Sequence, residues 1–133
     1  MKKQILALAI ASSFFAMTSA SAMTKDEYNA GKQKIEADYK AAKASCDAMK
    51  DNAKDVCMKE AKGNEDVAKA ELEAQYKPSA AHTRKVAQEK ADMTYNVAKE
   101  KCDDQTGDAK KSCVDMAKAE HDKAKADIKA MKG

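Results

Sequence analysis

Apolar side chains recur along this chain at the spacing of an α-helix. From Tyr28 onward they follow at steps of seven, four, three, four and three, and a later run steps four, three, four and three. Such steps place side chains on one narrow stripe of a helix, and the positions between them are rich in Lys, Asp and Glu. The pattern therefore predicts an all-α chain with coiled-coil-like seams and solvated outer surfaces. The stripes consist of Tyr28, Ile35, Tyr39, Ala42, Cys46 and Met49, and of Ala117, His121, Ala124, Ile128 and Met131.

Three short segments interrupt this pattern. In Lys77-Pro78-Ser79 the proline disfavours the helical conformation of the residue before it, and the serine can cap the helix that follows. Gly107-Asp108 is typical of a helix-ending glycine followed by an N-cap aspartate, and Asp51-Asn52 offers a weaker version of the same break. The breaks predict two antiparallel helical hairpins, with helices at about 25–50, 53–76, 80–105 and 109–131.

The two hairpins are predicted to arise from an internal duplication. The segment Cys46 to Cys57 has ten residues between its cysteines, and Cys102 to Cys113 repeats this arrangement 56 positions later. Gly63 aligns with Ala119 inside a predicted helix, and we interpret it as a tolerated cost of ~1 kcal/mol relative to alanine. Further matches at the same offset are Tyr39 with Tyr95, Ala42-Lys43 with Ala98-Lys99, Ala61-Lys62 with Ala117-Lys118 and Asp66 with Asp122.

The cysteines are candidates for two disulfides. If the first hairpin bends at Asp51-Asn52, Cys46 faces Cys57, and Cys102 faces Cys113 in the second hairpin. Each disulfide would remove roughly 2.5–3 kcal/mol of chain entropy from the unfolded state. This pairing is one of three connectivities that four cysteines allow. On an unbroken helix the cysteines of one segment would instead lie about 16 Å apart and could cross-link only to another chain.

The N-terminal segment has the features of a signal peptide. Lys2 and Lys3 precede an apolar run, and a small-residue cleavage site ends at Ala22, so we expect the mature chain to begin at Met23. The run is too short and too rich in serine for a membrane span, and no later segment is apolar enough to be one. The expected location is the periplasm or the medium beyond it.

The remaining residues predict one small domain with a thin core. We divide the chain into a signal peptide at 1–22 and two hairpin repeats at 23–77 and 78–133. Beyond the signal peptide there is no Trp or Phe, and alanine opposite alanine across a hairpin buries little apolar area. A small domain of this kind needs additional stabilisation, and an oxidising compartment makes disulfides available for it.

Soft-metal binding is an alternative use of the cysteines. Thiolates with methionine thioethers suit Cu(I). The spacing argues against such a site, because neither Cys-x-x-Cys nor a Met-x-x-Met series is present and methionine in an alanine-rich seam usually fills gaps. We therefore expect no cofactor. The candidate ligands under this alternative are Cys46, Met49, Cys57, Met58, Cys102, Cys113 and Met116, with His82 and His121 as possible additions.

Catalysis and nucleic-acid binding are not expected. A redox-sensing thiol protein is a second alternative, but reactive thiols usually form a close pair at a helix N-terminus. The chain lacks a nucleophile elbow, a zinc-protease motif and a phosphate-binding loop. The chain has 25 basic and 22 acidic side chains, so without Lys2 and Lys3 it keeps 23 basic ones, and the two signs are interspersed. This distribution argues against a nucleic-acid partner.

The arrangement Tyr-x-x-Ala-Lys-x-x-Cys-Asp, a gap of ten residues between the cysteines, and Cys-x-x-x-Ala-Lys resembles small exported Ala/Lys-rich proteins of Gram-negative bacteria. Residues 39–62 and 95–118 carry the resemblance. Some of these proteins carry the label TolA-like because of their composition alone. Any Ala/Lys-rich helix attracts that label. The resemblance implies an exported helical protein and no particular activity. We expect an envelope interaction or stress protein that binds an unknown protein partner or self-associates.

Overall fold

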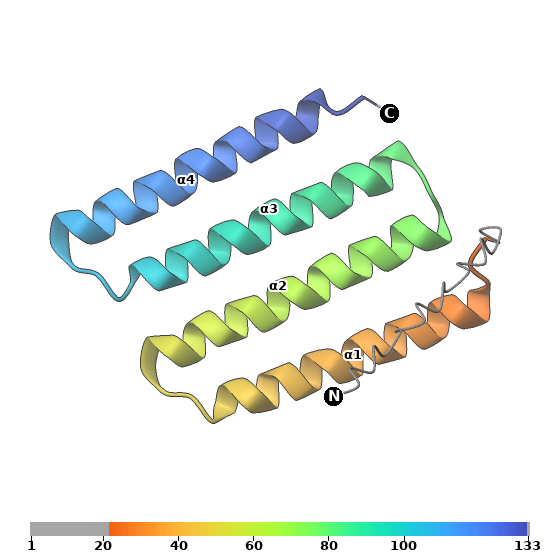
Figure 1. Cartoon of the computed structure of the whole chain (residues 1–133), viewed down its shortest axis with the longest axis horizontal. Coiled ribbons are helices and arrows are strands. Elements are labelled where there is room, and N and C mark those ends of the chain that lie inside the picture. Colours follow the sequence, from red (N-terminus) through yellow and green to blue (C-terminus); the bar gives the residue numbers. More distant parts are fainter. Residues whose placement is uncertain (1–21, 133) are drawn as a thin grey trace, which may run out of the picture.

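A computed structural model describes residues 22–132 of the chain as four helices in a single layer (Figure 1). The helices are α1 (Lys25–Asp47), α2 (Asp51–Tyr76), α3 (Ala80–Cys102) and α4 (Gly107–Ala130). Each differs from its predicted range by a few residues at most, so the predicted all-α fold of two antiparallel hairpins is confirmed. The predicted signal peptide lies outside the described residues, except for Ala22 at its end.

Local sequence signals explain where two of the helices begin. Thr24 caps α1 through a reciprocal pair of hydrogen bonds with Glu27, and these bonds hold the pKa of the Glu27 carboxyl below its usual value. Ser79 caps α3 by accepting a hydrogen bond from the backbone of His82, as predicted. At the start of α4 the prediction is wrong in detail. Asp108 is not the N-cap, because the helix already begins at Gly107 and no side chain caps it.

The two hairpin turns share one backbone conformation. Asp51 has a φ of 54° and Gly107 a φ of 58°, so both lie in the left-handed region. Glycine adopts this region freely, and aspartate is one of the few other residues that enter it at modest cost. Positions 56 apart thus make the same turn with different residues. The predicted break at Asp51-Asn52 is confirmed by this geometry.

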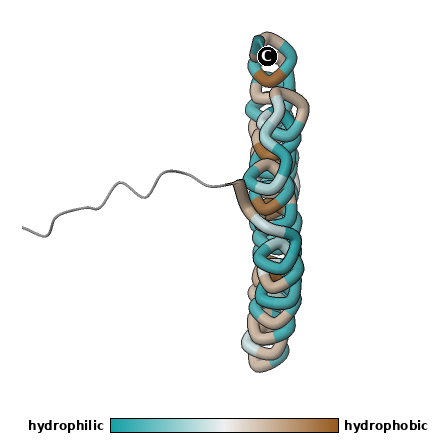
Figure 2. The backbone as a smooth tube through the Cα atoms, turned by 90° about the vertical axis from the view of Figure 1, so that its right-hand side faces the viewer, coloured by the Kyte–Doolittle hydropathy of each residue, from teal (hydrophilic) through white to brown (hydrophobic). Residues whose placement is uncertain are grey.

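The layer is one helix thick. Among the described residues, α1 packs on α2, α2 on α3 and α3 on α4, and no other pair of helices is in contact. Seen edge-on, the helices fall into a single column (Figure 2). The two hairpins therefore pack on each other through α2 and α3, in an open layer instead of a closed bundle.

The core of this layer is small. Leu72 and Val97 are the largest aliphatic side chains that are buried. The other buried apolar residues are Cys46, Ala61, Ala70, Cys102 and Ala117. Alanine contributes far less burial energy than the ~1.5–3 kcal/mol of a buried leucine or isoleucine, so helix packing alone stabilises the layer weakly.

A close contact between the hairpins depends on Gly63. A Cβ atom placed on Gly63 would lie 2.3 Å from Cγ and 2.8 Å from Cβ of Met93, so no side chain fits there unless the helices separate. The interpretation of this glycine as a mere tolerated cost was therefore incomplete. Its loss of helix propensity is offset by the packing of Met93 between α2 and α3.

The edges of the layer differ from the α2–α3 interface. Met93 and Val97 of α3 face α2, whereas the positions 56 residues earlier on α1 are the exposed Ala37 and Ala41. Similarly, Ala119 stands exposed on α4 at the position equivalent to Gly63. On the same stripe, Val67 of α2 corresponds to the exposed Lys123 of α4. The outer edges of α1 and α4 thus lack the residues that join the two hairpins.

We predict that Met93 decides whether Gly63→Ala lowers or raises the free energy of unfolding. In the wild-type background the new methyl group should collide with Met93 and lower the free energy of unfolding by about 1 kcal/mol or more, despite better helix propensity. In a Met93→Ala background the same change should raise it by up to ~1 kcal/mol. Urea unfolding followed by circular dichroism measures both values. A stabilising effect in both backgrounds would contradict the contact.

Candidate functional site

Three grooves run side by side on one face of the layer, and we call it the grooved face. A further hollow of about 570 Å³ at the α2–α3 end of this face shares Ala87 and Lys90 with the third groove. The first groove lies between α1 and α2, the central one between α2 and α3, and the third between α3 and α4, with volumes of about 270, 350 and 430 Å³. Asn64 lines both the first and the central groove, and Thr94 and Ala98 line both the central and the third. The shared residues show that the grooves form one continuous surface.

The first and third grooves are built from equivalent positions. Every residue that lines the first groove has its counterpart, 56 positions later, in the third. The alanines opposite each other in the predicted hairpins, such as Ala42 and Ala61, share a groove as expected. Four of the pairs differ in chemistry: Ile35 and Ala91, Asp38 and Thr94, Asn64 and Glu120, and Glu65 and His121. The third groove is also longer, because four further residues line it: Ala87, Lys90, Asp127 and Ile128.

The first groove contains a buried carboxylate with two partners. Glu65 accepts bonds from Lys62 at 3.1 Å and Lys69 at 2.6 Å, and its side chain is 8% exposed. Burial raises the pKa of Glu65, but the two lysines outweigh burial and hold the pKa below its usual value. Hydrogen bonds to Asp66 and to Glu65 raise the pKa of Lys62. All members of this network belong to α2.

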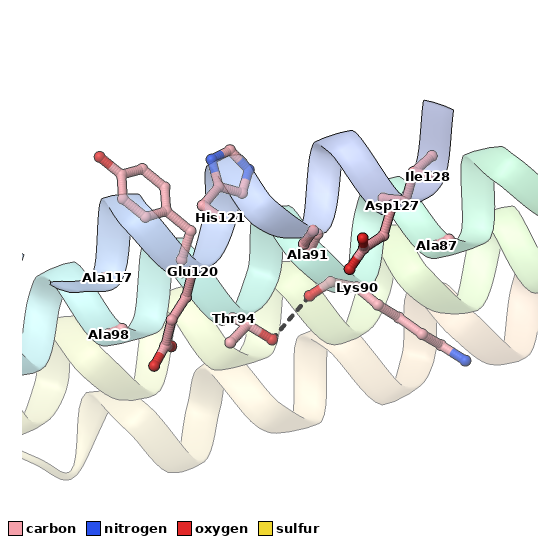
Figure 3. A pocket seen from close by; sticks show the side chains of 12 residues that line it. Ala87, Lys90, Ala91, Thr94, Ala98, Ala117, Glu120, His121, Asp127 and Ile128 are labelled. Atoms are coloured by element: carbon pink, nitrogen blue, oxygen red, sulfur yellow. Dashed lines mark hydrogen bonds between the residues drawn. The ribbon is translucent and has the colours of Figure 1, made fainter. Parts of the chain in front are cut away.

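The third groove contains a histidine in the equivalent place (Figure 3). The His121 ring stacks on Tyr95 with ring centroids 4.6 Å apart, and its Nε2 lies 2.5 Å from Oδ1 of Asp92. Burial raises the pKa of the Asp92 carboxyl, but hydrogen bonds from Gln88 and His121 outweigh it and hold the pKa low. His121 was predicted to be a seam residue beside Ala117 and Ala124, and the structure confirms this position. Its bond to Asp92 was not predicted.

Two ion pairs cross the central part of the grooved face. The Nζ of Lys101 lies 3.5 Å from Oε1 of Glu60, and the Nζ of Lys90 lies 2.7 Å from Oε1 of Glu71. In both pairs the acid belongs to α2 and the base to α3. All four side chains are between 44% and 59% exposed, so they remain accessible from outside the layer.

The two predicted disulfides are present. Cys46 pairs with Cys57 and Cys102 with Cys113, with Cα–Cα distances of 5.5 and 5.7 Å. Cys46 and Cys102 are fully buried, and their partners are half-buried. Each disulfide joins the two helices of a hairpin next to its turn, and no cysteine among the described residues is free. Two disulfides in a small domain are typical of proteins from oxidising compartments.

The structure brings only some of the alternative metal ligands together. The disulfides leave no thiolate for Cu(I), so a copper site would require the reduced chain. Met49 and Met116 are exposed on different parts of the layer, and Met58 directly follows Cys57 in α2. His82 hydrogen-bonds the carbonyl oxygen of Lys77, at the end of α3 opposite to Cys102. Within residues 22–132, no three His, Cys, Asp or Glu side chains are arranged to hold a metal ion.

The sequence alone did not reveal the grooved face. Its signal was present in the 56-residue offset, because the residues that line the first and third grooves align with one another. The ion pairs between α2 and α3 carried no such signal, since neither pair is repeated and each joins two separately predicted hairpins. No helix of the described region combines the length and apolar content that a bilayer span requires.

Comparison with protein-family models, curated proteins and solved structures finds no match to this chain. The candidate site must therefore be interpreted from its own residues.

We predict that the two disulfides contribute similarly to stability. Replacing Cys46 and Cys57 by alanine should lower the free energy of unfolding by roughly 2.5–3 kcal/mol, because the unfolded chain regains the entropy of the open loop. The matched control is C102A/C113A, which opens a loop of the same length, 11 residues in sequence separation. Urea unfolding measures both losses. Undiminished stability in either variant would contradict the structural role of that disulfide.

We predict that the Asp92–His121 contact makes stability depend on pH. A carboxyl whose folded pKa is depressed stabilises the fold above its unfolded pKa, near 3.8, and loses this effect as pH falls through the folded value. The thermal midpoint of Asp92→Asn should therefore lie below that of the wild type at pH 6 and approach it below about pH 3.8. The control is Asp104→Asn, in the exposed α3–α4 turn. A constant difference from pH 6 to pH 3 would contradict the prediction.

Proposed function

We propose that this protein is a non-catalytic, exported interaction protein that binds through its grooved face. The observation that carries the proposal is the single layer of helices. Domains normally bury their apolar surface between two packed layers, and here the residues lining the grooves have no second layer above them. Tyr39, Tyr95 and Ile35 are only half-buried in these grooves. A surface of this kind gains stability when another surface covers it.

The polar groups of the grooved face support binding over catalysis. Glu65 is held by two lysines, and His121 is held by Asp92 and stacked on Tyr95. The hydroxyl group of Thr94, in the third groove, donates a hydrogen bond to the carbonyl oxygen of Lys90. Glu65, His121 and Thr94 thus each bond to another group of the chain. We infer that these contacts fix the shape of the face.

Export to the bacterial periplasm is part of the proposal. The predicted signal peptide and the two disulfides support an oxidising compartment outside the cytoplasm. The resemblance to small exported Ala/Lys-rich proteins supports the same location. We extend the proposal to a role in the cell envelope, including a response to envelope stress, because the expected location is the periplasm.

Photo-cross-linking in intact cells tests the proposal. A photoreactive benzoylphenylalanine in place of Thr94 lies on the grooved face, where the central and third grooves meet. We predict that it forms discrete adducts with a protein. The control position is Ala119, which is also exposed but lies on the outer edge of α4. Equal labelling from both positions, or none from Thr94, would overturn the proposal.

A further inference from the structure

We propose that the grooved face is covered by the grooved face of a second copy of this chain. The inference rests on the proposed function and names its partner. In the proposed dimer, a two-fold axis runs parallel to the helices along the central groove. It places α2 of one copy over α3 of the other, and α1 over the other copy's α4.

The charges along the boundary between α2 and α3 fit this symmetry. The pairs Glu60–Lys101 and Glu71–Lys90 each put an acid on α2 and a base beside it on α3. The two-fold axis brings each acid over the base of the second copy at the same height along the helices. The result is two squares of charges in which every neighbour has the opposite sign. A two-fold interface is self-complementary, and these pairs meet that requirement.

The shapes of the outer grooves fit the same axis. The first groove of one copy faces the third groove of the other. Ile35 lines the first groove, of about 270 Å³, and the equivalent position in the third groove, of about 430 Å³, is the smaller Ala91. In the dimer Ile35 lies above the alanine-lined part of the partner's third groove, beside Ala91 and Ala124. On each side of the axis, the smaller first groove of one copy thus faces the larger third groove of the other.

The size of the face is sufficient for a stable dimer. Helices of 23–26 residues rise about 35 Å, and four of them at spacings of 8–10 Å give a face of roughly 1,200 Å². A standard stable interface needs about 800 Å² from each partner. The outer edges offer no comparable surface, because Ala37, Ala119 and Lys123 stand where the inner edges have Met93, Gly63 and Val67. Face-to-face contact is therefore favoured over edge-to-edge addition.

A charge-swapped chain tests the dimer and its axis together. The variant E60K/E71K/K90E/K101E exchanges the signs of both pairs, so each chain keeps its two internal ion pairs and two copies remain complementary. Between a wild-type and a swapped chain, however, all four contacts across the interface join like charges. We expect each protein alone to dimerise, and the mixed dimer to be about tenfold or more rarer than random exchange would give.

The measurement uses native mass spectrometry at low ionic strength. The full chain is expressed with its N-terminal segment and purified with both disulfides intact, and one of the two proteins is labelled with ¹⁵N. After equilibration, two homodimer masses with a depleted mixed mass support the proposal. A 1:2:1 distribution overturns the axis, because the ion pairs then do not face each other. The control swap K111D/D115K exchanges an ion pair within α4 that lines none of the three grooves, and it should mix freely.

Monomers at all concentrations in both proteins would overturn the second copy as partner. That result would leave the proposed function standing if the probe at Thr94 still formed adducts in cells with a protein of another mass. Failure of the adducts as well would remove both. Adducts at twice the mass of the chain from Thr94, and none from Ala119, agree with the dimer.

Discussion

Each hairpin depends on its disulfide because the seam between its two helices is built mainly of alanine. Such a seam lets helices approach closely, but it buries little apolar surface. The covalent link beside each turn offsets this weakness by restricting the unfolded chain, and it fixes which residues of the two helices lie opposite each other. The grooves follow from this arrangement, because their floors are the alanines that the links hold in register.

The contact between the hairpins has a different chemical basis. It combines a glycine, a methionine and a valine with ion pairs that run from α2 to α3. Neither outer edge repeats this combination, so the layer ends after four helices. Stability and extent are thus controlled by different residues: the disulfides stabilise each hairpin, and the central interface limits the layer to two of them. The grooved face remains uncovered in this arrangement, and for this reason we assign binding to it.

Several features could be predicted from the sequence because they depend on neighbours in the chain. The helices follow from periodicity, the cap at Ser79 from its place after Pro78, and the cysteine pairing from the position of the turns. The predicted cap at Asp108 was wrong because the chain enters α4 one residue earlier, at a left-handed Gly107. The sequence signals there allow either start, and the geometry of the turn selects one.

The sequence by itself determined the all-α class, the two hairpins and their disulfides, since each of these depends on residues that are close along the chain. Only the tertiary structure decided that the hairpins lie in one layer, that Gly63 makes room for Met93, and that acids of α2 meet bases of α3. These features depend on how α2 rotates against α3. Periodicity leaves that rotation undetermined, because α2 packs on both α1 and α3 and the sequence does not say which residues of α2 meet which neighbour.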